Sequence, residues 1–301
     1  MYDCLIIGGG PSGANCALWL KMLGFTPIIV ESRDRLGGLQ NESPFQNHWI
    51  VSTVGKTGQE IALDIERSIL QHKISYLLNT AVVKVSRNNL GFVASTEQAQ
   101  LIQAKTIVVA AGVSPERGDL IEAKGVYFGP GKIITSLQLI GKRIAILGGG
   151  DNAFENYLFL KSRGVSCAHI YSRSIRARSE FVQQVPAHDI TLGKCQVNEN
   201  DLTVNANKYD FVLVLYGWRP NAPDLFSFPI KKDQRGYLKT DQFCATDVAG
   251  LYAVGEVTQR THPCCITAMA DGVIAAKAIQ ARLECHPSYE TTDKQTPALT
   301  A

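Results

Sequence analysis

The sequence predicts an α/β fold with two Rossmann-like dinucleotide-binding domains, and two observations support this prediction. A short apolar run leads into a glycine turn at residues 3–13, and the same pattern recurs at residues 143–153. Each turn is followed by a helical stretch and a second β-rich run, at residues 26–30 and 166–171. Repeated units of strand, glycine turn, helix and strand form parallel sheets with right-handed crossovers.

Length and composition are those of an ordinary globular protein. The 301 residues suffice for two domains with separate cores, and 45% of them are hydrophobic and 19% charged. The net charge is only +3, with Lys and Arg spread along the chain, so we expect no nucleic-acid partner. No apolar run reaches the roughly 18 residues that cross a bilayer, so we expect no membrane association.

The amino terminus and the cysteines predict a cytoplasmic protein. The chain begins with a strand pattern in place of a basic stretch and a cleavage site, so we expect no signal peptide. The eight cysteines show neither a CxxC pair nor the spacing of a zinc site. We therefore expect reduced thiols and no bound metal.

The other elements follow from residue patterns along the chain. Apolar periodicity and turn residues predict, in chain order, a loop over 43–58, a helix over 60–74, a hairpin over 90–102, buried strands over 106–111, 211–216 and 251–254, and a helix over 266–283. The polar tail from residue 286 contains Pro and Thr, and we expect it to be disordered.

The first glycine turn has the residues that a dinucleotide pyrophosphate requires. In Gly8-x-Gly10-x-x-Gly13 the first glycine permits the tight turn, the second lets the backbone approach a phosphate, and the third lets helix and strand pack closely. The free N–H groups at the helix start then meet the phosphate. Glu31, at the end of the next strand, places a carboxylate where the hydroxyls of an adenosine ribose would lie.

Three further features favour FAD over NAD at this turn. A second glycine pair, Gly37-Gly38, follows Glu31 closely and would approach the middle of a long dinucleotide. Gly255-Glu256 offers a carboxylate to a ribityl chain. The helix that starts at Ile266 would stabilise negative charge on a reduced flavin through its amino terminus.

The second glycine turn predicts an NAD(P)H site. Gly148-x-Gly150-x-x-Ala153 has the same form, with alanine in the third place. The strand after it ends without an acid, and Arg173, Arg176 and Arg178 follow. Guanidinium groups bind a 2′-phosphate that an acid would repel, which favours NADPH. The alternative is an ordinary solvated basic loop, which would leave this domain free to have lost nucleotide binding.

Short motifs recur along the chain in a specific order: Pro11-Ser12-Gly13, Gly37-Gly38-Leu39-Gln40, Ala110-Ala111-Gly112, Gly217-Trp218-Arg219-Pro220-Asn221, Ala245-Thr246 to Ala253, and Gly255-Glu256. In this combination they resemble the low-molecular-weight thioredoxin reductase family of FAD/NADPH flavoproteins. The resemblance covers about residues 1–285.

The resemblance implies a discontinuous FAD domain at residues 1–114 and 247–286, an inserted NAD(P)H domain at 115–246, and a tail at 287–301. It also implies a homodimer whose two domains rotate. With the glycine turns, it predicts that FAD is bound by Gly8, Gly10, Pro11, Ser12, Gly13, Glu31, Gly38, Leu39, Gln40, Asn47, Val82, Ala111, Gly112, Gly255, Glu256, Cys265 and Ile266. It predicts that NADPH is bound by Gly148, Gly150, Asp151, Asn152, Ala153, Arg173 and Arg178.

The chain departs from the family at the redox centre. Family members carry a CxxC pair shortly before the second glycine turn, whereas this chain has Lys124 to Thr135 there and no cysteine between Cys16 and Cys167. A dithiol relay needs two thiols that can close on one another. We therefore expect that the chain cannot reduce thioredoxin by the usual route.

Two adjacent thiols near the predicted flavin site offer a different chemistry. His262-Pro263-Cys264-Cys265 precedes the helix at Ile266, and the helix amino terminus would depress the thiol pKa of Cys265. Cys264 and Cys265 are candidate catalytic thiols, and His262 is a candidate proton carrier. The alternative is that all three residues only pack or lie on the surface, because a vicinal disulfide is strained.

The leading hypothesis is an FAD-dependent NAD(P)H oxidoreductase that passes hydride to a non-dithiol acceptor. Oxygen (a weak NADPH oxidase or diaphorase activity), a small molecule and a small redox protein are the candidate acceptors. The alternatives are disulfide exchange through Cys264 and Cys265, a ferredoxin-linked reductase, and a flavin-binding protein without turnover.

Overall fold

The computed structural model describes residues 1–131, 133–222, 224–258 and 262–284. Contacts divide the chain into two compact units. Unit 1 contains Met1–Gly38, Leu63–Gly112 and the described chain from Ala222 onward, and unit 2 contains Leu39–Ala62 and Val113–Asn221.

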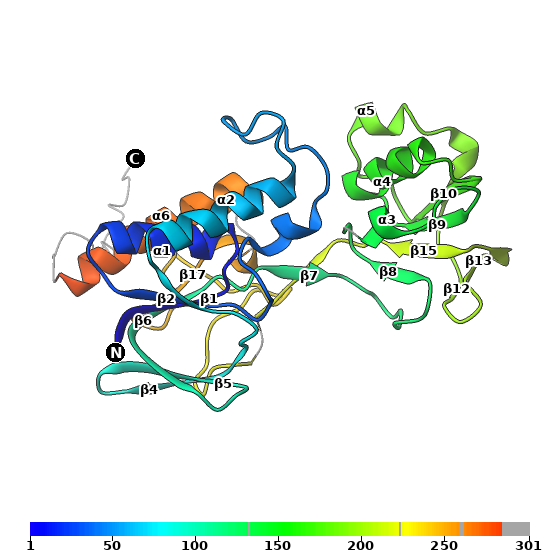
Figure 1. Cartoon of the computed structure of the whole chain (residues 1–301). Helices are drawn as coiled ribbons and strands as arrows, with labels where there is room; N and C mark the ends of the chain where they lie inside the picture. The colour runs from blue at the N-terminus through cyan, green and yellow to red at the C-terminus, as the bar shows by residue number, and fades with distance from the viewer. Residues whose placement is uncertain (132, 223, 259–261, 285–301) are drawn as a thin grey trace, which may run out of the picture. The chain divides into compact units, whose positions relative to one another are not determined.

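Unit 1 is built on one sheet whose central strands are parallel (Figure 1). The strand order is β3-β2-β1-β6-β5-β4, with β17 also paired to β6. Neighbours from β3 to β6, and β17 with β6, run parallel, whereas β6-β5 and β5-β4 are antiparallel. The strands are β1 (Tyr2–Ile7), β2 (Pro27–Val30), β3 (Ser75–Leu77), β4 (Val82–Asn88), β5 (Gly91–Thr96), β6 (Leu101–Val109) and β17 (Leu251–Ala253).

Two long helices of this unit pack tightly against each other. They are α1 (Pro11–Met22) and α6 (Cys265–Leu283). Of the other helices, η3 (Gly255–Thr258) and α2 (Gly58–Gln71) from Leu63 onward belong to unit 1, whereas η1 (Gly38–Glu42) belongs to unit 2 from Leu39 onward. A Cβ on Gly272 of α6 would lie 2.4 Å from the carbonyl oxygen of Ser12. The side chain of Asn15 donates to the carbonyl of Met269 at 2.7 Å. The α1–α6 contact therefore depends on a glycine and holds both helix starts in place.

Unit 2 is built on a parallel sheet of order β11-β10-β9-β15-β8. Its strands are β8 (Val126–Phe128), β9 (Arg143–Leu147), β10 (Cys167–Ser172), β11 (Ile190–Leu192) and β15 (Phe211–Val214). Small antiparallel sheets join β12 (Val197–Asn198), β13 (Thr203–Val204) and β14 (Asn207–Lys208), and β7 (Val113–Pro115) with β16 (Trp218–Pro220). Its helices are α3 (Ile133–Ser136), α4 (Asp151–Ser162), α5 (Ser179–Val182) and η2 (Ala187–Asp189).

The two predicted Rossmann-like units are confirmed, and differences from the expected elements are local. The predicted hairpin at 90–102 belongs to an antiparallel extension that also contains β4. A bulge between Val82 and Lys84 leaves Val83 and Lys84 both exposed, so the alternation that marks a strand is interrupted there.

The contact grouping differs from the expected domain boundaries at two places. Residues 222–246 group with unit 1, and residues 39–62 group with unit 2. Residues 222–246 attach to unit 1 because Val85 donates to the carbonyl of Leu225 at 2.6 Å and Leu238 donates to Val257 at 3.1 Å. The predicted tail at 287–301, together with Cys285, lies outside the described residues.

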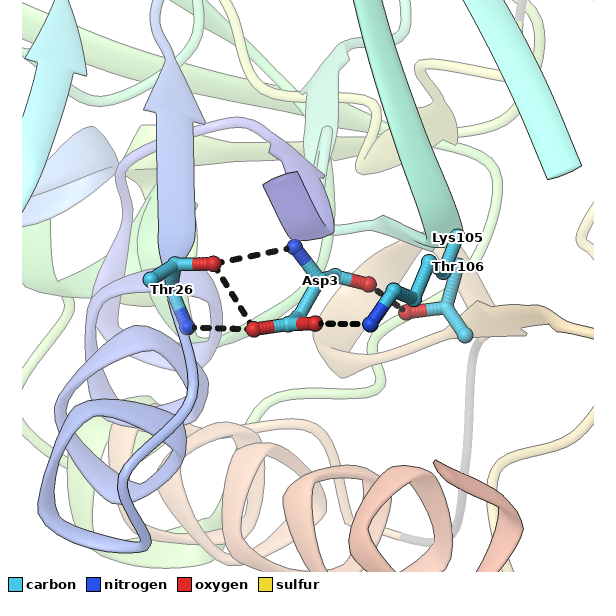
Figure 2. Close-up of polar contacts among 4 residues, drawn as sticks. All are labelled: Asp3, Thr26, Lys105 and Thr106. Carbon is cyan, nitrogen blue, oxygen red and sulfur yellow. Dashed lines mark hydrogen bonds and ion pairs between the residues drawn. The ribbon is translucent and has the colours of Figure 1, made fainter. Parts of the chain in front are cut away.

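A polar cluster links the start of β1, the residue before β2 and the middle of β6 in unit 1 (Figure 2). The carboxylate of Asp3 on β1 accepts from the backbone N–H and the hydroxyl of Thr26, at 2.9 and 2.7 Å, and from Lys105 on β6 at 2.8 Å. Thr106 donates to the carbonyl of Asp3 at 2.8 Å. Burial raises the pKa of Asp3, but the hydrogen bonds from Lys105 and Thr26 outweigh it and leave that pKa below its ordinary value.

We expect Asp3→Asn to lower the free energy of unfolding of the FAD-free protein by about 1–3 kcal/mol at pH 7. Because the folded pKa of Asp3 is depressed, its contribution is complete above the unfolded pKa of about 3.9 and is lost as pH falls through the folded pKa. Denaturant titrations should therefore show the difference between wild type and variant shrinking below about pH 4. Asp34→Asn is the control, because the 73%-exposed Asp34 lies 3.8 Å from Arg35 and should contribute little. Equal losses in both variants would contradict the prediction.

Candidate functional site

The first glycine turn lies at the carboxyl end of β1 and has no room for side chains at two positions. Gly8 has a φ of +107°, and a Cβ there would lie 2.4 Å from the carbonyl oxygen of Ala110. A Cβ on Gly13 would lie 2.0 Å from the carbonyl oxygen of Gly8. Helix α1 begins at Pro11, and its N-cap, Gly10, has no side chain to cap the first N–H groups. These donors therefore remain for a ligand at the helix start.

Gly10 and Gly38 face each other across the turn. A Cβ on Gly10 would find only the Cα of Gly38, at 3.6 Å. Gly38 has a φ of +56°, and a Cβ there would lie 2.9 Å from the Cα of Gly10. Two backbone segments without side chains thus approach each other closely at the amino terminus of α1. This arrangement fits a pyrophosphate, which needs close access to backbone N–H groups.

Glu31 is fixed beside the turn at the end of β2. Its side chain is 7% exposed, and its Oε2 atom accepts from the backbone N–H of Gly9 at 2.8 Å. Its Oε1 atom accepts from the backbone N–H of Arg33 at 2.9 Å. The Ser32 hydroxyl also donates to Oε1 at 3.3 Å, so Oε2 is the oxygen that keeps a vacant acceptor site. The position and this remaining capacity fit a ribose hydroxyl.

Gly255 and Glu256 reach the same end of the sheet from 240 residues further along the chain. Gly255 has a φ of +73°, and a Cβ there would lie 2.7 Å from the hydroxyl oxygen of Ser12. The buried carboxylate of Asp271 accepts from the backbone N–H of Gly255 at 3.1 Å. Burial raises the pKa of Glu256. Asp271 was not among the predicted site residues. The only sequence signal for it is an acidic residue among the small apolar residues of the predicted helix.

Other predicted FAD residues have different surroundings. Ala111 and Gly112 follow β6, beside the turn, because Ala110 donates to the carbonyl of Ile7 at 2.8 Å. Val82 is a buried core residue at the start of β4, and Ile266 is 45% exposed in the first turn of α6. Leu39, Gln40 and Asn47 belong to unit 2 by their contacts, so their part in FAD binding stays a prediction.

The vicinal thiols differ from the expectation. Cys264 is the N-cap of α6: its Sγ atom accepts from the backbone N–H of Thr267 at 3.5 Å, and the Thr267 hydroxyl accepts from the N–H of Cys264 at 3.0 Å. Burial raises the pKa of Cys264, but the bonds from Thr267 and Ile266 outweigh it and leave a lowered value. Burial raises the pKa of Cys265 to about 12. The expected depression at Cys265 was therefore wrong, because the cap position belongs to Cys264.

We expect iodoacetamide to alkylate Cys264 at least tenfold faster than Cys265 near neutral pH, because only the thiolate reacts. The rate at Cys264, which is exposed, should level off at a lower pH than that of an ordinary thiol, whereas the rate at Cys265 should still be rising near pH 12. Peptide mapping by mass spectrometry measures both rates in one sample, and Thr267→Val should slow Cys264 alone. Faster labelling of Cys265 would contradict the assignment.

Both thiols are free, and His262 is exposed with a φ of +52°.

The second glycine turn repeats the geometry in unit 2. Gly148 has a φ of +149°, and a Cβ there would lie 2.3 Å from the carbonyl oxygen of Leu215. A Cβ on Gly150 would have nothing within 4 Å. Helix α4 begins at Asp151 without a side-chain cap bond, and Ala153 is fully buried behind it. The open space over Gly150 fits a second pyrophosphate.

The basic loop after β10 folds back on this turn. Arg176 and Ala177 donate their N–H groups to the carbonyl of Gly149, at 2.7 and 3.0 Å. Arg178 donates its N–H to Asp151 at 2.8 Å, and its Nε lies 3.2 Å from the second carboxylate oxygen of Asp151. Its guanidinium also lies 4.1 Å from the ring centre of Phe181. Arg178 is thus held by protein groups, whereas Arg173 and Arg176 are exposed.

Comparison with known proteins agrees with this arrangement of two glycine turns. The family described as pyridine nucleotide-disulphide oxidoreductase matches residues 2–272. The chain belongs to this family. Thioredoxin reductases and ferredoxin–NADP reductases of this family use FAD and NADPH, so the cofactor prediction is confirmed at the level of the family, and so is the resemblance to thioredoxin reductases.

Individual relatives are distant in sequence. The chain is 29% identical over 286 residues to a ferredoxin–NADP reductase of Limosilactobacillus fermentum, with 85% of each chain covered. It is 24% identical over 297 residues to a thioredoxin reductase of Borreliella burgdorferi, covering 91% of this chain and 90% of the relative.

Solved structures share the fold. Thioredoxin reductase of Lactococcus lactis matches with a TM-score of 0.79 at 21% identity, covering 93% of this chain and 98% of that one. The bacillithiol disulfide reductase Bdr of Staphylococcus aureus matches with a TM-score of 0.75 at 16% identity, with coverage of 93% and 98%.

Two further features are absent from the described residues. No described helix is both long and apolar enough to cross a membrane. Among the same residues, no group of His, Cys, Asp and Glu side chains is arranged to hold a metal ion.

Proposed function

We propose that this protein is an FAD-dependent oxidoreductase that takes hydride from NADPH and passes the electrons to an acceptor other than a CxxC dithiol of its own. The observation that carries the proposal is the bare backbone where Gly10 meets Gly38, with the fixed carboxylate of Glu31 beside it. When bound there, FAD supplies a group that accepts and donates hydride.

The chain itself would bind and orient the two nucleotides. Gly10 and the first N–H groups of α1 would hold the FAD pyrophosphate, and Glu31 would accept from a ribose hydroxyl. Glu256, presented by the turn that Asp271 anchors, would contact the ribityl chain. Gly150 would admit the NADPH pyrophosphate, and the exposed Arg173 is the better placed of the predicted arginines for a 2′-phosphate.

Three classes of electron acceptor fit the proposal. The absence of cysteine between Cys16 and Cys167 argues against a dithiol at the family's usual position. Oxygen, a quinone-like molecule or a small redox protein such as a ferredoxin would take the electrons, the last in line with one relative's description as a ferredoxin–NADP reductase. We further propose a cytoplasmic homodimer.

Disulfide exchange is a second candidate function, favoured by the exposed and acidified thiol of Cys264. The two are separated by measuring NADPH oxidation with oxygen, a quinone, a ferredoxin and a small disulfide, in wild type and in Cys264→Ser. We expect turnover with a non-disulfide acceptor that Cys264→Ser leaves unchanged. If only the disulfide supports NADPH oxidation, and Cys264→Ser abolishes that activity, the result would favour disulfide exchange as the function. No NADPH oxidation with any acceptor would contradict both.

A further inference from the structure

Unit 1 contains a pocket that lies away from the glycine turn, toward the other end of the strands. It has a volume of about 830 Å³ and lies between the β4–β5 turn, the loop before β17 and the last turn of α6. Lys105, which lines it, stands four residues before Val109, and Val109 pairs with Ile7 at the start of the glycine turn. Four strand residues span about 13 Å. The pocket is therefore separate from the proposed FAD site.

The pocket carries positive charge that the chain does not neutralise. Its lining includes three cations, Arg87, Lys105 and Arg282, and one carboxylate, Asp241. Lys105 is paired with Asp3 at 2.8 Å, as Figure 2 shows. Asp241 accepts from the N–H groups of its own loop at 2.8 and 2.9 Å. Within the described parts of the chain, neither Arg87 nor Arg282 has a carboxylate partner.

The walls add aromatic surface and a hydroxyl group. Gly250 has a φ of +83°, and a Cβ there would lie 3.3 Å from Cε2 of Phe92 and 3.4 Å from Nε of Arg282. The missing side chain thus leaves the guanidinium of Arg282 open to the pocket, whereas Phe92, which is 3% exposed, contributes only the edge of its ring. The guanidinium of Arg87 lies 5.6 Å from the centre of the Phe92 ring, on which it packs. Tyr252 also lines the pocket, and burial raises its pKa to about 12, so its hydroxyl can donate at neutral pH.

We propose that this pocket binds a small organic anion that carries a phosphate or carboxylate group and a flat ring, about the size of a nucleoside monophosphate. The guanidinium groups of Arg87 and Arg282 bind such oxygens as forks, and Tyr252 donates a further hydrogen bond. The ring packs against Phe243, a half-buried residue of the pocket wall. The volume lies within the usual range for small-molecule sites, about 300–1,000 Å³.

Calorimetry on the FAD-loaded protein saturated with NADP⁺ tests this, because both glycine turns are then occupied. The probes are AMP, citrate, inorganic phosphate and adenosine. We expect AMP or citrate to bind with a dissociation constant of about 1 mM or below, and adenosine to bind at least tenfold more weakly. Binding of AMP but not citrate would identify the ligand as a phosphate that carries a ring. Binding of citrate but not AMP would identify it as a carboxylate.

The variants Arg282→Ala and Arg87→Ala should each weaken binding by about tenfold or more, and Tyr252→Phe by less. Arg67→Ala is the matched control, because Arg67 is 74% exposed on α2 outside the pocket lining. Binding of neither anion, adenosine as tight as AMP, or an affinity unchanged by Arg282→Ala would each overturn the proposal. NADPH turnover should stay unchanged in both arginine variants, so the outcome is independent of the proposed reaction.

Discussion

Gly10→Ala should yield a folded protein that is purified without flavin and binds added FAD at least 100-fold more weakly than wild type. Gly10 has φ −71° and ψ −175°, a conformation that alanine adopts without strain. Its Cβ would touch only the Cα of Gly38, at 3.6 Å, so the protein itself has room for it. The methyl group would instead fill the space through which a pyrophosphate approaches the N–H groups of α1. Losing two charge-assisted hydrogen bonds there accounts for about 3 kcal/mol or more.

Stability measurements on FAD-free protein separate an effect of Gly10→Ala on FAD binding from an effect on folding. FAD-free Gly10→Ala should match the stability of FAD-free wild type or exceed it slightly, by about 0.4–1 kcal/mol, because alanine restricts the unfolded chain. The control is Gly131→Ala, which is outside both glycine-turn sequences and whose Cβ would meet only a carboxylate oxygen of Glu42 at 3.7 Å. Flavin fluorescence titrations measure the affinities. An unchanged FAD affinity in Gly10→Ala would remove the first glycine turn from the FAD site.

Gly150→Ala should abolish flavin reduction by NADPH while leaving bound FAD in place. Gly150 has φ −93° and ψ 179°, and its added Cβ would have nothing within 4 Å, so we expect no change in stability beyond about 1 kcal/mol. The methyl group would block close approach of the NADPH pyrophosphate to the start of α4. We expect the apparent affinity for NADPH to fall at least 100-fold, which corresponds to about 2.8 kcal/mol.

The two alanine variants form a reciprocal pair. Gly150→Ala should keep the FAD content of wild type, and Gly10→Ala should still bind NADP⁺, because the turns belong to different compact units. Stopped-flow absorbance under anaerobic conditions measures reduction, and equilibrium dialysis with NADP⁺ measures binding. Normal reduction rates in Gly150→Ala would remove the second glycine turn from the NADPH site.

Local patterns predicted the strands and turns well because both depend on short-range physics. Gly8, Gly13 and Gly148 stand where a Cβ would collide with backbone, as the motif predicts, and Gly10 and Gly150 leave open space at the start of a helix. The buried runs that become β9 and β15 are apolar on both faces, as expected for parallel strands. The bulge in β4 interrupts the alternation, which is why that strand was missed.

Other features depended on contacts between distant residues and were beyond local patterns. The pKa values of Cys264 and Cys265 depend on which residue becomes the N-cap, and helix boundaries are uncertain by one or two residues from sequence alone. The ion pair of Arg178 with Asp151 joins residues 27 positions apart. The pocket at Arg87 and Arg282 brings together a strand turn and the end of α6, which no motif connects.

The central claim is that the chain binds FAD and reduces it with NADPH. The most direct test is an anaerobic titration of the purified protein with NADPH, followed through the visible absorbance of the flavin. We predict yellow protein whose flavin band bleaches with about one NADPH per FAD and returns when oxygen is admitted. Protein that is colourless and refuses added FAD, or bound flavin that stays oxidised in excess NADPH, would contradict the account.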